Sequence, residues 1–341
     1  MIGMALGQRA PEVAGATRSG AFYSLDLQAG RPAVLLFLHG CGPAAARGLL
    51  DALEPALSLL GEAGVDLVPL APPDLAYARA FDGGGAPCEA AVYTASPWPA
   101  DQADGPSALV VDRSGRVVHQ AVVYGAEDLL QAQARAAARL ASEAPRLCRS
   151  SAPVLILPNL MTPSDCRVLI DRFEAAEHRV GVMAAVRDGE AVVKLDESKK
   201  RRREIQLEPG ALEHDMILSV LAERCAPEIK RAFQADIAHA DRILVARYDD
   251  SGGWFKRHRD NAAPQTAFRE FAVSINLNTQ DYEGGELLFP EFDDHRYSPP
   301  AGSAIIFSAS LLHEAAAVTR GARYVALSFL CTAKALERVS A

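Results

Sequence analysis

Apolar runs and helix-favouring segments alternate in the first 145 or so residues of the chain. Residues 33–39 (AVLLFLH) and 65–70 (VDLVPL) are mostly apolar, which is typical of buried strands. The Ala/Leu-rich segment between them, 44–62, predicts a helix. A strand, a helix and a second strand in this order indicate a βαβ unit with parallel strands, so we expect an α/β domain here.

The same domain is expected to close with a hairpin and a helix. Strands over 107–111 and 116–122 flank Asp-Arg-Ser-Gly at 112–115, a favourable turn sequence, and an Ala-, Leu- and Gln-rich segment over 128–144 predicts the helix. Periodicity is then lost, and Pro and Ser accumulate up to residue 153. We place a domain boundary near residue 150, with domains over 1–148 and 153–335.

The second part of the chain predicts helices followed by antiparallel strands. Thr-Pro-Ser-Asp at 162–165 forms a capping-box pattern that starts a helix ending at about residue 175, and a further helix is expected over 211–233. Residues 271–278 alternate apolar and polar side chains with a period of two. We therefore expect an antiparallel β domain with supporting helices.

The amino-acid composition is that of a globular protein and argues against several other classes of protein. The 341 residues are 49% hydrophobic and 23% charged, as in ordinary globular proteins of two domains. The net charge of −8 disfavours general nucleic-acid binding. The longest apolar stretch, 33–38, is too short to span a bilayer, and no secretory leader is visible, so a cytoplasmic location is the default expectation. The six scattered cysteines are expected to be reduced thiols.

A candidate metal site begins at His258-Arg-Asp260. On an extended segment, residues two apart point to the same side, so one imidazole and one carboxylate can reach one cation. His313, just after an apolar segment at 304–307, is the leading candidate for a third ligand. Two histidines and a carboxylate form the facial triad of non-haem iron(II) oxygenases. An isolated His-X-Asp triplet is weak evidence, because most such triplets bind no metal.

Several motifs around this triplet occur together in a fixed order. They are Tyr-X9-His-X-Asp at 248–260, Tyr-Glu-Gly-Gly-Glu-Leu at 282–287, Phe-Pro at 289–290, Pro-Pro-Ala-Gly-X-Ala at 299–304, His313, and Thr-Arg-Gly-Ala-Arg-Tyr at 319–324. Through them the chain, over roughly 153–332, resembles the prolyl-4-hydroxylase-like branch of the iron(II)/2-oxoglutarate dioxygenases. The resemblance implies a double-stranded β-helix, or jelly roll, with His258, Asp260 and His313 as iron ligands.

The resemblance also implies roles for three further residues. Arg323 matches the residue that pairs with the far carboxylate of 2-oxoglutarate, which suits the planar guanidinium fork; otherwise it is a surface arginine after a turn. Tyr248 matches a tyrosine that hydrogen-bonds the same carboxylate, and otherwise is a strand aromatic. Asn276 lies where relatives often have a cosubstrate-facing residue.

The implied activity is hydroxylation of an unactivated C–H bond. The enzyme would bind iron(II), consume 2-oxoglutarate and O2, and release succinate and CO2. Ascorbate is a candidate stimulant. The substrate would be an amino acid, a peptidyl side chain or a natural product. Neither a nucleic acid nor a membrane is an expected partner, and a homodimer is open. A noncatalytic binding module on the same fold is the alternative.

The first 145 or so residues resemble a thioredoxin-fold redoxin of the peroxiredoxin type. The resemblance rests on Leu-Gly-Gln-Arg-Ala-Pro at 6–11, the strand–turn–helix around 33–62, and residues 106–115. At the turn, His39-Gly-Cys41-Gly-Pro-Ala44 leaves no local Cys-X-X-Cys pair. We expect a domain that is not redox-active and that serves dimerisation or docking; a thiol redox protein using Cys41 is the rival.

Residues 199–203 (KKRRR) are a run of five positive charges in an acidic protein. Such a run is expected to form a solvated loop. Guidance of an acidic substrate is the functional alternative, because related enzymes often place substrate-proximal loops here.

Overall fold

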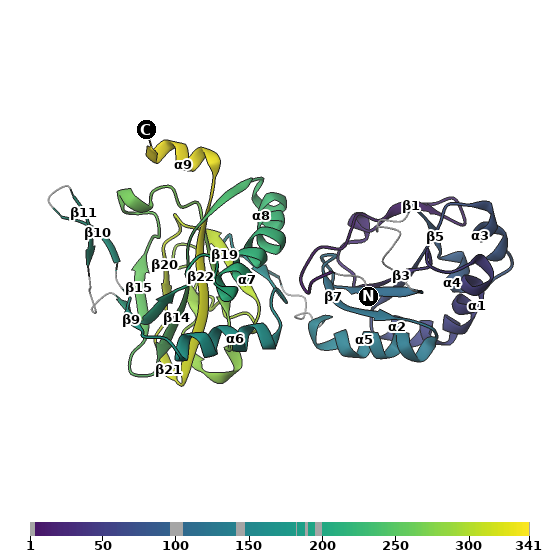
Figure 1. Ribbon diagram of the computed structural model, residues 1–341, viewed down its shortest axis with the longest axis horizontal. Coiled ribbons are helices and arrows are strands. Elements are labelled where there is room, and N and C mark those ends of the chain that lie inside the picture. Colours follow the sequence, from purple (N-terminus) through teal and green to yellow (C-terminus); the bar gives the residue numbers. More distant parts are fainter. Residues whose placement is uncertain are drawn as a thin grey trace. The chain divides into compact units, whose positions relative to one another are not determined.

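The computed structural model describes residues 4–95, 105–140, 147–181, 183–187, 190–194 and 200–340. The chain divides into two compact units, 1–144 and 145–341 (Figure 1). Within the described residues, no helix is long and apolar enough to cross a membrane.

The N-terminal unit is built on one mixed sheet. Its elements in chain order are β1 (Ala14–Thr17), β2 (Phe22–Ser24), η1 (Asp26–Gln28), β3 (Ala33–Phe37), α1 (Pro43–Leu53), η2 (Glu54–Ala56), α2 (Leu57–Glu62), β4 (Asp66–Ala71), α3 (Leu75–Ala80), α4 (Ala86–Glu89), β5 (Val92–Tyr93), β6 (Ser107–Val111), β7 (Val117–Val122) and α5 (Ala126–Leu140). Within the described residues the strands of the sheet have the order β2-β1-β5-β4-β3-β6-β7. Strand β3 pairs in parallel with β4 and antiparallel with β6.

Strand β3 explains the continuous apolar run in the sequence. Val34 and Leu36 pack into one hydrophobic cluster, and Leu35 and Phe37 pack into another on the opposite face of the sheet. Both faces are therefore buried, and no polar alternation is needed. The βαβ unit and the hairpin are present as expected. The last residues expected in the closing helix, 141–144, lie outside the described residues.

The expectation of one helix over 44–62 is wrong. The structure has α1, a 3-10 turn η2 and α2 in its place. Pro55 lies in η2. Because proline has no backbone N–H and its ring clashes with the preceding turn, an α-helix cannot run through it undisturbed.

The C-terminal unit consists mainly of antiparallel strands. Its elements in chain order are β8 (Leu155–Leu157), α6 (Pro163–Glu174), β9 (Arg179–Val180), β10 (Met183–Arg187), β11 (Glu190–Lys194), β12 (Lys200–Arg201), β13 (Arg203–Gln206), α7 (Leu212–Val220), the π-helix η3 (Leu221–Cys225), α8 (Ala226–Phe233), β14 (Ile237–Asp249), β15 (Trp254–His258), η4 (Pro264–Thr266), β16 (Phe271–Asn276), η5 (Thr279–Asp281), β17 (Glu283–Gly284), β18 (Leu287–Leu288), β19 (Ala304–Ser308), β20 (His313–Ala315), β21 (Val318–Arg320), β22 (Ala322–Thr332) and α9 (Ala333–Ser340).

Two sheets of this unit form the frame of the site. Within the described residues, the larger has the order β8-β19-β16-β22-β14-β13-β9 and the smaller the order β12-β15-β20-β18. Alternate residues of β19 divide between two cores: Ile305 and Phe307 pack with residues of the smaller sheet, whereas Ala304 and Ile306 pack with the helices. The outer face of the larger sheet is thus covered by α6, α7 and α8 (Figure 1), and the inner face is left for the site.

The helix expected over 211–233 is present but carries a π-helical segment, η3, at its centre. Pro227 follows directly within α8, and its missing N–H removes one backbone hydrogen bond of the α pattern. A π segment at this point accommodates that loss. The capping box at Thr162 is formed as the sequence indicates, with reciprocal bonds to Asp165.

Candidate active site

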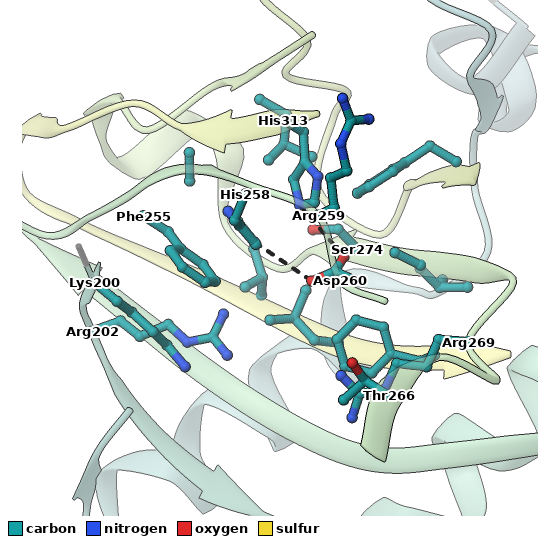
Figure 2. A pocket seen from close by; sticks show the side chains of 18 of the residues that line it. Lys200, Arg202, Phe255, His258, Arg259, Asp260, Thr266, Arg269, Ser274 and His313 are labelled. Atoms are coloured by element: carbon teal, nitrogen blue, oxygen red, sulfur yellow. Dashed lines mark ion pairs between the residues drawn. The ribbon is translucent and has the colours of Figure 1, made fainter. Parts of the chain in front are cut away.

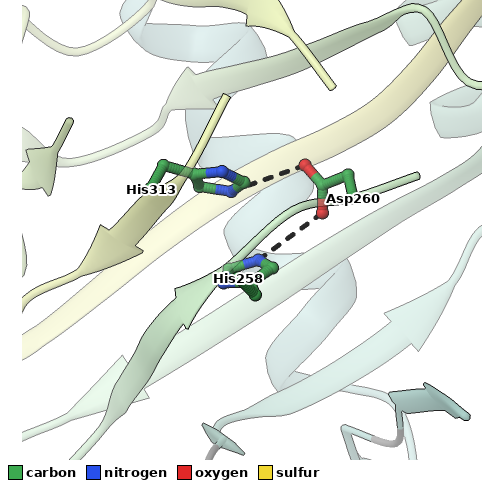
Figure 3. A group of neighbouring side chains, drawn as sticks. All are labelled: His258, Asp260 and His313. Carbon is green, nitrogen blue, oxygen red and sulfur yellow. Dashed lines mark ion pairs between the residues drawn. The ribbon is translucent and has the colours of Figure 1, made fainter. Parts of the chain in front are cut away.

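Three side chains converge between the two sheets. His258 ends β15 and His313 begins β20, and the two residues are direct partners in the antiparallel pairing of these strands. Asp260 follows β15 by two residues, and its backbone N–H donates to the carbonyl of Ala309. The carboxylate lies 3.5 Å from His258 Nε2 and 3.4 Å from His313 Nε2 (Figure 3).

Both imidazoles are oriented by the backbone. His258 Nδ1 lies 2.7 Å from the carbonyl of Lys256, and His313 Nδ1 lies 3.0 Å from the carbonyl of Leu311. Because a carbonyl can only accept, each Nδ1 donates, and in the neutral imidazole this leaves the lone pair on Nε2. Both lone pairs are then available at the centre of the group.

The protonation states also suit a cation. Burial lowers the pKa of His313 to about 4, so this imidazole is neutral near pH 7. Burial alone would raise the pKa of Asp260, but its interactions with His313 and His258 lower that pKa to about 2. The group therefore offers an anionic carboxylate and the neutral imidazole of His313, next to the imidazole of His258.

This donor set fits a divalent metal ion. Ligand atoms of the three residues all lie within 4.8 Å of one another. Two imidazoles and one carboxylate are the ligand set of non-haem iron(II) sites that keep open positions, and the backbone contacts at Nδ1 are the outer-shell bonds that such histidines usually make.

The three residues line a cavity of about 390 Å³, large enough for a small-molecule ligand. One wall carries cationic side chains, and Phe255 lies between these and His258 (Figure 2). Much of the remaining lining is apolar: Leu287, Phe307, Ala315, Val325 and Leu327.

Arg323 lines this pocket from the start of β22 and is only 2% exposed. Its Nη2 donates to Asn276 Oδ1 at 3.1 Å, and its Nε has no hydrogen-bond partner among the described residues. Asn276 contacts Arg323 but is not part of the pocket lining. Its Nδ2 donates to the carbonyl of Pro299. The structure thus presents a buried guanidinium with an unused donor.

The Gly-Gly pair at 284–285 makes room for this arginine. Both glycines have positive φ, 77° and 70°, which disfavours other residues. A Cβ on Gly285 would lie 2.9 Å from Arg323 Cδ. The pair is therefore needed for both backbone shape and space.

Tyr248 is buried and pairs with Arg323 across β14 and β22. The Arg323 guanidinium lies 5.4 Å from the centre of the Tyr248 ring. On its other side, Arg202 Nη1 donates to the Tyr248 hydroxyl at 2.8 Å. Since that oxygen accepts from Arg202, the hydroxyl proton is available to a ligand.

The expectation that the basic run forms a solvated loop is wrong for Lys200 and Arg202; Lys199 lies outside the described residues. Lys200 is 3% exposed, and both side chains line the pocket. The reason is topological, because the chain crosses here from the smaller sheet, through β12, to the larger one, through β13. Burial, and then the charge of Arg202, lower the pKa of Lys200 to about 7.

Glu204 is the carboxylate that compensates this cluster. Its Oε2 lies 3.3 Å from Lys200 Nζ and 2.8 Å from Arg202 Nη2, and its Oε1 lies 3.1 Å from Arg242 Nη2. The sequence analysis did not single out Glu204 or Arg242. The spacing of two residues in the sequence could have indicated the role of Glu204, because it places Lys200, Arg202 and Glu204 on one side of an extended chain.

Comparison with known proteins gives a partial match within this unit. The model of the 2OG-Fe(II) oxygenase superfamily matches residues 243–331. A PKHD-type hydroxylase of Picosynechococcus sp. is 37% identical over 90 residues, covering 26% of this chain and 41% of the relative. One from Hyphomonas neptunium is 34% identical over 26% of this chain and 43% of its own length. One from Cupriavidus metallidurans is 28% identical over 49% of this chain and 73% of its own length.

The chain thus spans less than half the length of the first two relatives. Among solved structures, a Pseudomonas putida prolyl-4-hydroxylase has a TM-score of 0.42 and 18% identity, covering 53% of this chain and 94% of its own.

All three converging side chains and Arg323 fall inside the stretch that the superfamily model matches. The expectation of an iron(II) and 2-oxoglutarate domain is confirmed by that match together with the His-Asp-His geometry. The C-terminal unit therefore contains a domain of the 2OG-Fe(II) oxygenase superfamily.

Proposed function

We propose that the chain is an iron(II)- and 2-oxoglutarate-dependent hydroxylase that oxidises an unactivated C–H bond of an amino-acid, peptidyl or natural-product substrate. The observation that carries the proposal is the meeting of His258, Asp260 and His313 in one pocket with the buried guanidinium of Arg323. The three triad residues would hold iron(II). Iron(II) and 2-oxoglutarate, when bound, supply the activation of O2, with succinate and CO2 as co-products.

The chain itself binds and orients the cosubstrate. Arg323 pairs with its far carboxylate through a charge-assisted contact, and Asn276 fixes the guanidinium for that contact. Tyr248 donates its hydroxyl proton to the same carboxylate, since its oxygen is already occupied by Arg202. The apolar lining keeps water from the reacting centre.

The direct test is an assay for succinate with iron(II), O2 and 2-oxoglutarate, run against a panel of amino acids and peptides. Succinate release that depends on a substrate, with product masses raised by one oxygen atom, would support the proposal. Purified protein that binds iron(II) but never forms succinate from 2-oxoglutarate would argue for a noncatalytic binding module instead.

Replacing Arg323 by leucine should weaken 2-oxoglutarate binding by tenfold or more while leaving the metal bound. A lost charge-assisted contact costs roughly 1.5–3 kcal/mol. The measurement is calorimetry of 2-oxoglutarate binding to the manganese(II)-loaded protein. Arg320→Leu, which removes an exposed arginine three residues away, is the matched control. Equal affinities in Arg323→Leu and the parent would exclude this role for Arg323.

For the N-terminal unit, the proposal is a thioredoxin-like scaffold without redox activity. Its support is the βαβ unit β3-α1-β4 followed by the hairpin β6-β7 and helix α5 on one sheet. Burial raises the pKa of the Cys41 thiol, which is opposite to the lowered pKa of reactive cysteines. A docking or dimerisation role for this unit and a cytoplasmic location stay predictions.

Replacing Cys41 by serine should therefore leave hydroxylation unchanged, and the parent protein should consume no peroxide. Cys148→Ser is the control, because Cys148 is exposed and could react with peroxide adventitiously. Peroxide consumption that is lost in Cys41→Ser and kept in Cys148→Ser would show that the N-terminal unit is a second enzyme.

A further inference from the structure

One wall of the pocket holds more guanidinium groups than acidic side chains. Arg202 and Arg242 share the carboxylate of Glu204, at 2.8 Å and 3.1 Å. Arg323 contacts the neutral amide of Asn276. Among the described residues, Glu204 is thus the one carboxylate that contacts Arg202 and Arg242, and no carboxylate contacts Arg323. Buried charge without compensation is costly, so the wall favours an anionic ligand.

The cosubstrate does not account for this excess. If the proposed function holds, 2-oxoglutarate has two carboxylates, of which one belongs to the metal and the other to Arg323. Neither is left for Arg242. The positive charge that remains at Arg202 and Arg242 therefore favours binding of a second anion, which the substrate would supply.

Arg242 and Arg323 line the pocket from different positions along the paired strands β14 and β22. In the pairing of β14 with β22, Tyr248 is the partner of Arg323, and Asp241 is the partner of Phe329. Tyr248 follows Arg242 by six positions, which at about 3.3 Å per residue corresponds to roughly 15–20 Å along the strand. The two backbone positions thus lie far apart along the sheet, and the two guanidinium groups have different partners, Glu204 for Arg242 and Asn276 for Arg323.

Arg242 is also accessible to solvent and has an unusual backbone conformation. Its side chain is 34% exposed, whereas that of Arg202 is 8% exposed, so a ligand from solvent meets Arg242 first. Arg242 has φ of +47° at an irregularity in the strand pairing. Non-glycine residues rarely adopt this conformation, and such positions cluster at ligand sites.

We propose that the substrate carries a carboxylate that binds Arg242, alongside Lys200 and Arg202. Phe255 separates this wall from the triad: its ring centre is 3.4 Å from that of His258, and Lys200 Nζ is 5.3 Å from the ring (Figure 2). An anion held at the wall leaves the adjoining part of the molecule to pass over Phe255 to the triad. The carboxylate is either the free α-carboxylate of an amino acid or the acidic side chain of a peptide.

The test compares ligands that differ only in this charge. N-acetyl amino acids are titrated against their carboxamides, and short peptides with internal Asp or Glu against those with Asn or Gln, by calorimetry on protein loaded with manganese(II) and 2-oxoglutarate. The acid of at least one pair should bind about tenfold more tightly than its amide, which is the size of one charge-assisted contact. The pair in which the acid binds more tightly shows whether the site prefers an α-carboxylate or a side-chain carboxylate.

Three variants assign the preference to Arg242. Arg242→Gln should abolish the difference between acid and amide without changing amide binding, Arg242→Lys should keep most of it, and Arg320→Gln should keep all of it. Equal affinities for acids and amides in the parent, no acid binding at all, or a preference that survives in Arg242→Gln would overturn the proposal.

The same titrations on metal-free protein separate this proposal from the one on which it rests. The wall is formed by the chain itself, so a preference for acids that depends on Arg242 should persist without metal. Failure to bind manganese(II) or 2-oxoglutarate would count against the proposed hydroxylase, whereas loss of the acid preference alone would count against the substrate assignment.

Discussion

Replacing His313 by alanine is expected to abolish iron(II) binding and turnover. The triad supplies three ligand atoms, and no fourth His, Cys, Asp or Glu joins the cluster among the described residues. Loss of an outer-shell partner of a metal ligand already costs about 10–100-fold in affinity, so loss of a ligand should cost more. Calorimetry with iron(II) under anaerobic conditions measures the effect, and His258→Ala and Asp260→Ala should behave alike.

His295→Ala is the matched control. His295 is exposed and lies outside the pocket, so its removal should leave iron(II) affinity and succinate release as in the parent. A His313→Ala protein that still bound iron(II) with parental affinity would show that the third ligand comes from elsewhere.

Replacing Glu204 by glutamine is expected to lower the free energy of unfolding of the C-terminal unit by about 3–5 kcal/mol, the cost of breaking a buried ion pair by removing one partner. Glu204 is 6% exposed and contacts Lys200, Arg202 and Arg242, and its loss would leave the buried charges of Lys200 and Arg202 without this carboxylate. Urea unfolding monitored by tryptophan fluorescence gives the difference, because Trp254 lies in this unit.

The difference should depend on pH in a defined direction. Burial alone would raise the pKa of Glu204, but Arg202, Lys200 and Arg242 lower it from 4.5 to about 2. A pKa that is lower in the folded state contributes stability above the unfolded value and loses it as the pH falls through the folded value. The gap between parent and Glu204→Gln should therefore be full above pH 4.5 and shrink toward pH 2.

The exposed pair of Glu283 and Arg320 provides the control, since ion pairs in water contribute little to stability. Glu283→Gln should unfold like the parent. A Glu204→Gln protein as stable as the parent at neutral pH would mean that water or another group compensates the three cations.

The geometry of the triad could be anticipated from the sequence, because local rules apply to it. Residues two positions apart on an extended segment point to the same side, and this rule predicted that His258 and Asp260 lie close together. That His313 would pair directly with His258 across two strands could not be read from spacing, since strand register is set by long-range packing.

The interior position of Lys200 and Arg202 was missed for a similar reason. A run of charges predicts solvent exposure when only composition is considered. What buries these side chains is a crossing between sheets and a carboxylate partner in Glu204, and both depend on tertiary structure. The interruptions of the helices at Pro55 and near Pro227, by contrast, followed from local chemistry that the sequence displays.

The contacts that fix the two imidazoles also bear on how the site tolerates mutation. Each Nδ1 is held by a backbone carbonyl two residues earlier, not by a side chain. Substitution of Lys256 or Leu311 would leave that carbonyl in place, so nearby sequence can drift without changing the tautomer of either histidine. The pocket lining around the triad can therefore change in evolution, while the orientation of both imidazoles is kept with the backbone.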